Sequence, residues 1–126
     1  MGSTTSQSSG RTFQATAVAI EAYACVAVDS SGTISVAGDN ATDKYIGVVT
    51  EDIAASGYGN VQMANAGGTA QVLCGGNTIA VGDIVYTDGS GKIGTDSSNT
   101  VVGYAMLASS TDGDVIEVIL KQPVLV

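Results

Sequence analysis

The acidic turn DGSGK at residues 88–92 is the stretch of this sequence that comes closest to a site for chemistry. Its carboxylate, hydroxyl and backbone oxygens are the ligand types that Ca²⁺ prefers. A calcium loop also needs acids at alternating positions and a distant bidentate Glu, and this stretch has neither. Aspartate followed by glycine is equally the chemistry of a tight turn, so we expect a β-hairpin turn here and neither a metal nor another cofactor.

Catalytic groups are hard to find elsewhere. The sequence has no histidine, which excludes the Ser-His and Cys-His nucleophile systems. Asp112 and Asp114 flank Gly113 in what reads as another turn, where their structural use explains them. A paired-carboxylate hydrolase would need two acids that converge in a cleft. We therefore expect no enzymatic activity and assign no catalytic residue.

The two cysteines, Cys25 and Cys74, lie in the segments AYACVAV and QVLCGGN. The chain has no CxxC pair and no metal-ligand spacing. Free cysteine is among the most buried residue types, so we expect two buried thiols. A disulfide between them is the alternative.

Charge is scarce and unbalanced in this chain of 126 residues, which is the length of one domain. Charged residues make up 13% of the sequence and the formal net charge is −8. The four basic residues are too few and too scattered to bind phosphates, which argues against nucleic acid as a partner. No apolar run is long enough to span a membrane, so we expect no membrane partner. A surface with little charge favours lasting contact with a partner or with copies of itself.

A pattern of strand, turn and strand occurs twice. Residues 19–36 align with residues 78–95, and YIGVV at 45–49 aligns with VVGYA at 101–105. The matched turn and strand residues are Asp29 with Asp88, Gly32 with Gly91, Gly47 with Gly103, and Gly57 with Gly113. We infer an internal duplication with repeat halves at about 19–63 and 78–120.

The predicted fold class is all-β with a minor short helix, arranged as a small sandwich or barrel-like domain. The segment TEDIAAS at 50–56 is the helix candidate, with Thr50 as its N-cap. AQVL at 70–73 reads as a strand between the modules, and Tyr86 and Tyr104 are expected to close the core. The last strand, residues 114–121, is apolar apart from Glu117, which predicts either two buried faces or one face in the core and one in a subunit contact.

The N-terminal segment is rich in Ser, Thr, Gly and Gln and lacks apolar periodicity. Such a segment cannot bury enough surface to offset its ordering entropy. We therefore expect a flexible arm over residues 1–14 and a single β-rich domain over residues 15–126.

The second copy resembles the closing half of the small capsid decoration, or cement, proteins of tailed bacteriophages. In that family an I-x-x-G-D-x-V segment leads to a turn, a V-G-x-A strand, a glycine-containing turn and a final apolar strand. The matching residues are Ile79, Gly82, Asp83, Val85, Val102, Gly103, Ala105, Gly113 and the strand from Val115 to Leu120. The first copy departs from this pattern, because it has Tyr23 and Ala24 in place of the Gly-Asp pair.

The resemblance implies a non-enzymatic virion structural protein on the outer surface of the assembled capsid. It further implies the major capsid protein as partner, stabilisation of contacts between shell subunits, and a homo-oligomer, with a trimer favoured. An arm that pairs with a shell strand and buries Phe13 would offset its ordering entropy. The candidate capsid-binding residues are therefore Arg11, Thr12, Phe13 and Gln14.

Three other functions remain as alternatives. A tail or fibre module, or a surface adhesion β-module, would share the turns and the low charge. An enzyme of unrecognised type is disfavoured by the missing histidine. An assembly chaperone would leave before the particle matures, whereas a cement protein is stoichiometric with the shell.

Overall fold

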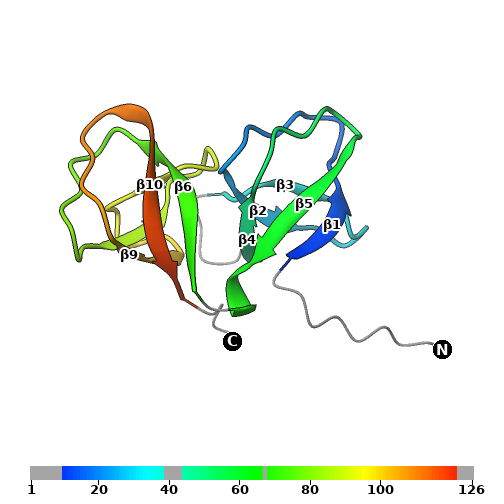
Figure 1. The fold of residues 1–126 in the computed structure, drawn as a ribbon. Coiled ribbons are helices and arrows are strands. Elements are labelled where there is room, and N and C mark those ends of the chain that lie inside the picture. The colour runs from blue at the N-terminus through cyan, green and yellow to red at the C-terminus, as the bar shows by residue number, and fades with distance from the viewer. Residues whose placement is uncertain (1–9, 39–43, 67, 122–126) are drawn as a thin grey trace.

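The computed structural model describes residues 10–38, 44–66 and 68–121 and is nearly all β, as the sequence predicts. Figure 1 shows two groups of strands side by side, one coloured blue to green and the other green to red. The first unit contains β1 (Gly10–Gln14), β2 (Cys25–Val28), β3 (Ile34–Val36), β4 (Tyr45–Val49) and β5 (Tyr58–Met63). The second contains β6 (Thr69–Gly75), β7 (Ile84–Thr87), β8 (Ile93–Gly94), β9 (Val101–Ala105) and β10 (Asp112–Leu120).

The two units share one pairing scheme. In the first unit the strand order is β1-β5-β4-β2-β3, and in the second the order β6-β10-β9-β7-β8 closes into a barrel. Each of these neighbouring pairs is antiparallel. A single parallel bridge joins the first strand to the third, between Ala15 and Ile34 in one unit and between Cys74 and Ile93 in the other. The repeating unit is therefore longer than the sequence alignment indicated, because it includes β1 and β6.

The strand register corrects one detail of the repeat. The sequence alignment places Gly57 on Gly113. Gln14 and Leu73 are equivalent positions of the repeat, and Gln14 pairs with Tyr58 whereas Leu73 pairs with Val115. Tyr58 is therefore equivalent to Val115. That register makes Ser56 the counterpart of Gly113. Both residues have a positive φ, 59° at Ser56 and 92° at Gly113. The alignment by glycine identity was wrong by one residue, because the backbone conformation is shared and the residue type is not.

The two hairpin turns are held by aspartate side chains. Oδ1 of Asp29 accepts hydrogen bonds from the backbone N–H groups of Ser31 at 2.9 Å and Thr33 at 3.1 Å. Oδ1 of Asp88 does the same for Ser90 at 2.9 Å and Lys92 at 3.2 Å. The glycine ahead of the return strand, 32 or 91, has a φ of 82° or 85°. The stretch DGSGK is thus a turn that satisfies its own backbone donors.

Glycine inside β4 and β9 allows two strands to approach closely. A Cβ atom built at Gly47 would overlap the carbonyl oxygen of Gln62, and one built at Gly103 would overlap the carbonyl oxygen of Ile119. Each glycine also lies next to a register shift in the pairing with β2 or β7. These strands therefore need glycine for contact between backbones.

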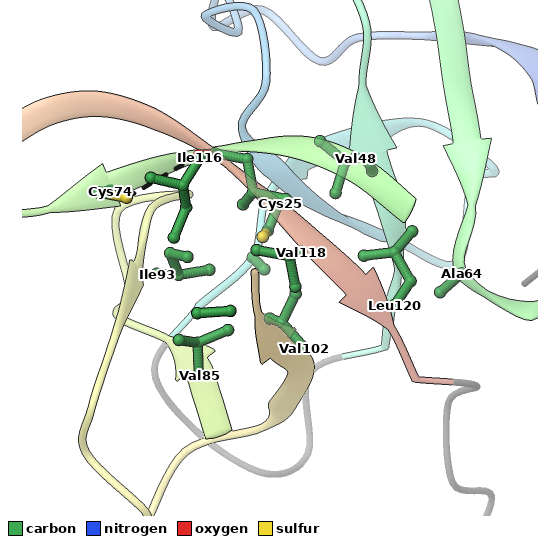
Figure 2. Packing of buried hydrophobic residues seen from close by; sticks show 14 of the residues in the cluster. Cys25, Val48, Ala64, Cys74, Val85, Ile93, Val102, Ile116, Val118 and Leu120 are labelled. Carbon is green, nitrogen blue, oxygen red and sulfur yellow. Dashed lines mark hydrogen bonds between the residues drawn. The ribbon is translucent and has the colours of Figure 1, made fainter. Parts of the chain in front are cut away.

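The core consists of two clusters, and one of them crosses the boundary between the units. The first cluster, with Phe13, Ile34 and Val61, fills the first unit. The second fills the second unit and also includes Cys25, Val48 and Ala64 from the first. Figure 2 shows Cys25 and Val48 among the side chains of this second cluster, which also contains Val118 and Leu120 of β10. Burial of apolar surface therefore holds the two units together as well as each unit alone.

Two predicted segments were wrong. Residues 10–14, expected in a flexible arm, form β1, which pairs with β5 over its whole length. Phe13 is only 7% exposed, so its ring belongs to the core, which supplies the burial that composition alone did not predict. The segment 50–56 is not helical, because Ile53 bridges Ile20. The helical turn is instead η1 (Ala64–Ala66), a 3-10 turn before β6. Residues 1–9 and 122–126 lie outside the described residues.

β10 has one buried and one exposed face. Ile116, Val118 and Leu120 point into the core, while Val115, Glu117 and Ile119 are exposed. Of the two arrangements expected for this strand, burial on both faces within the chain is therefore wrong. The other arrangement, with one face in the core and one in a subunit contact, stays a prediction.

Candidate functional site

β1 carries the four residues expected to bind a capsid, and the strand presents them differently. Arg11 and Thr12 are exposed, Gln14 is half-buried, and Phe13 is in the core. The Arg11 guanidinium lies over the Phe13 ring, 4.5 Å from its centroid. Nε2 of Gln14 donates to the carbonyl oxygen of Ser56 at 3.0 Å. Only Arg11 and Thr12 remain fully available for an external contact, on opposite sides of the strand.

A groove of about 640 Å³ runs between the two units. Its floor and walls combine Tyr23 and Val48 of the first unit with Leu107, Val115 and Glu117 of the second. The remaining lining residues are threonines, glutamines and one alanine. Because the groove has only one carboxylate among its described lining residues, it is better suited to hydrogen bonds with backbone and amide groups than to binding an ion.

Among the described residues, most of the exposed large apolar side chains belong to the second unit. Ile84, Tyr104 and Ile119 stand opposite one another on the neighbouring strands β7, β9 and β10. They are 43%, 50% and 40% exposed. Tyr104, expected to close the core, therefore points outward instead. The sequence predicted that one face of the last strand could lie in a subunit contact, but it did not say which residues form that face. Ile84 and Tyr104 could not be assigned to the same face as Ile119 without the strand register.

The two thiols and the Tyr45 hydroxyl are buried. Cys25 and Cys74 are both free and buried, as the sequence predicts. Burial raises the pKa of the Cys25 thiol, and it also raises the pKa of Cys74. Because the thiolate is the nucleophilic form, neither thiol is activated. The Tyr45 hydroxyl is buried with no hydrogen-bond partner among the described residues, and burial raises its pKa well above the usual value.

The predicted turn residues of the second unit serve structure rather than chemistry. Nζ of Lys92 donates to Oδ1 of Asp112 at 2.8 Å and ties the turn at 88–92 to the start of β10. The hydrogen bond from Lys92 Nζ to Asp112 raises the pKa of that lysine. Within residues 10–38, 44–66 and 68–121, no group of three or more Cys, Asp or Glu side chains could hold a metal ion. No helix in the same ranges is long and apolar enough to cross a membrane.

Comparison with known proteins shows what this architecture is similar to. No curated protein matches the chain. Among solved structures, the crystal structure of the head fiber gp8.5 N base of bacteriophage phi29 matches with a TM-score of 0.68 and 26% sequence identity. The match covers 92% of this chain and 98% of that one. The profile of a family described as phage cement protein matches residues 12–120, which includes every strand of the described residues except the first two residues of β1. The chain therefore belongs to the phage cement protein family.

Proposed function

We propose that this chain binds the outer surface of the assembled phage capsid and stabilises the contacts between shell subunits. The match of the family profile to residues 12–120 carries the proposal, since that family has a structural role in the virion in association with the capsid. Its partner is the major capsid protein. The chain acts as a homo-oligomer, with a trimer favoured, and it performs no enzymatic reaction.

The surface chemistry supports a passive clamp. Charged residues are only 13% of the sequence, so little charge must be desolvated when the surface is covered. The thiols are buried, and the carboxylates of Asp29 and Asp88 accept hydrogen bonds within their own turns. These groups therefore have structural roles. A clamp of this kind adds buried area across a joint between shell subunits, which stabilises the joint in proportion to the apolar area removed from water.

Arg11 is the residue of β1 that we assign to the shell. Its guanidinium is held over the Phe13 ring, so the side chain loses less freedom on binding than a free arginine would. Its planar fork can donate paired hydrogen bonds to a carboxylate or to backbone carbonyls of a shell subunit. Phe13 itself cannot serve, because the core already holds its ring.

A capsid-pelleting assay tests this proposal. Purified expanded capsids that lack the chain are mixed with the wild-type protein, with Arg11→Glu, or with Lys44→Glu as the control at another exposed cation. We expect the wild type and Lys44→Glu to pellet in a fixed ratio to shell subunits and to raise the capsid's disruption temperature. Arg11→Glu should bind at least about tenfold more weakly, the loss of roughly one charge-assisted hydrogen bond. Absence of wild-type pelleting would overturn the proposal.

A second candidate is the base of a surface fibre or adhesion module. It is favoured by the likeness to a head fiber N base, which covers nearly the whole of both chains. Binding of the purified chain to host cells or to a glycan, with no affinity for expanded capsids, would support this candidate over the first.

A further inference from the structure

Equivalent rows of residues on the outer faces of the two units meet different surroundings. The members of each row stand directly opposite one another on three neighbouring strands, at matching positions of the repeat. The outer row of the first unit is Cys25, Val48 and Gln62, and the outer row of the second is Ile84, Tyr104 and Ile119.

The outer row of the first unit is covered by the second unit. Cys25 and Val48 are 0% and 1% exposed. The N–H of Cys25 donates to the carbonyl oxygen of Gly91 at 2.6 Å, and Nε2 of Gln62 donates to the carbonyl oxygen of Thr69 at 2.8 Å. The covering elements are therefore β6 and the turn at 88–92. Figure 2 shows the result, with Cys25 and Val48 inside the shared cluster.

The outer row of the second unit is uncovered although its side chains are larger. Its three members are between 40% and 50% exposed. The nearest acid on the same face of β10 is Glu117, and its Oε2 accepts a hydrogen bond from the Thr69 hydroxyl at 2.8 Å, beside the row. Adjoining exposed apolar side chains on neighbouring strands mark an interaction site.

We propose that a second copy of this chain covers the outer row of the second unit with β1 and the turn at 29–33 of its first unit. These are the counterparts of β6 and the turn at 88–92, which already cover the equivalent row within the chain. The inference rests on the homo-oligomer of the proposed function and names the surfaces that form it. It makes the contact heterologous, head to tail, since two different surfaces meet.

Both counterpart elements have exposed positions where this contact would form. A methyl group added at Gly91 would lie 2.9 Å from Cγ1 of Val36, because the turn of the second unit packs against the first. At Gly32 an added methyl group would meet nothing within 4 Å, and Thr12 on β1 is exposed. This contact also explains why the uncovered row has larger residues. Separate copies lose translational and rotational freedom on association, which tethered units do not, so a contact between copies needs more apolar burial to be stable.

Sedimentation of the purified chain, without capsids, tests the inference independently of shell binding. The row variant is Tyr104→Lys, with Val81→Lys as its control, since Val81 is 63% exposed and lies outside the row. The variant of the covering surface is Thr12→Lys, with Val18→Lys as its control, since Val18 is 67% exposed. We expect the wild type and both controls to associate between micromolar and millimolar concentration. Each test variant should raise the dissociation constant by about tenfold or more.

A mixture of the two variants distinguishes head-to-tail association from any symmetric one. Tyr104→Lys keeps an intact covering surface and Thr12→Lys keeps an intact outer row, so the mixture should form a heterodimer that neither variant forms alone. A wild-type chain that stays monomeric at millimolar concentration would overturn the inference. So would a Thr12→Lys variant that associates like the wild type, or a mixture that stays monomeric.

Discussion

The second unit has glycine or a large apolar residue at several positions where the first unit has something else. Gly82 and Tyr23 occupy the same left-handed position, with φ of 90° and 69°. In the outer rows, Tyr104 of the second unit stands at the position of Val48 of the first unit. Tyr104 is exposed, whereas Val48 is buried. The strand pairing is thus the same in both units whichever residues occupy these positions. The residues that differ between the units are ones whose surroundings differ.

The largest expected effect comes from the glycines that both units share. Gly47→Ala and Gly103→Ala should each destabilise the fold by at least about 4 kcal/mol, because the added methyl group overlaps a backbone carbonyl oxygen. Urea unfolding measures the loss. Gly113→Ala, where the methyl group meets open space, is the control and should cost far less. Similar costs at all three positions would show that the close strand approach is unimportant.

The next effect compares the cores. Phe13→Ala should destabilise the protein by about 3–5 kcal/mol, because it leaves a large cavity in the first cluster. Val72→Ala at the equivalent position of β6 should cost about 2 kcal/mol, because fewer buried carbons are lost. Unfolding midpoints of the two variants decide the order. A Phe13→Ala variant as stable as the wild type would indicate that residues 10–14 are a flexible arm and not part of the folded core.

The strained turns give a smaller effect. Gly82→Ala should destabilise by about 1 kcal/mol, because its φ of 90° disfavours a side chain while the space around it is open. Tyr23→Gly relieves the same strain in the first unit but also removes a wall of the groove. We expect the net change at Tyr23 to stay within about 1 kcal/mol in thermal unfolding. A cost at Tyr23 well above that at Gly82 would mean that the ring holds the units together.

The smallest effect concerns pH and the aspartate turn at 29–33. The Thr33 hydroxyl donates to Oδ2 of Asp29 at 2.6 Å and, with backbone donors, holds the pKa of that carboxyl below its usual value. A carboxyl with a lowered folded pKa contributes stability above its unfolded pKa of about 3.9, and loses it as pH falls through the folded value. Thr33→Val should therefore cost stability near neutral pH and progressively less in acid. Urea unfolding midpoints of the wild type and the variant, measured from neutral to acidic pH, test this pH dependence. A stability cost that grows on acidification would contradict it.

The sequence was informative where local chemistry decides the structure. Asp29 and Gly32 predict a turn because a carboxylate and a positive φ are needed within a few residues. Gly47 and Gly103 were matched in the repeat, and both lie where two strands approach closely, because only glycine lacks a Cβ atom. The all-β class and the buried thiols follow from composition and short-range pattern in the same way.

The remainder depended on contacts between distant segments. Composition marks residues 10–14 as disordered, and only pairing with β5, more than 40 residues later, makes β1 a strand. Ile53 was assigned to a helix because its bridge partner, Ile20, is remote in sequence. The outer row could not be predicted, because one shift of register would have turned Ile84 and Tyr104 into the core.

Image reconstruction of purified virions tests the central claim most directly. We expect density for the two-unit fold on the outer surface of the shell, bridging neighbouring shell subunits, in a fixed ratio to them. In that density the outer row of the second unit should be buried against another copy. Particles that lack the chain on their shell, or carry it only on the tail, would contradict the account.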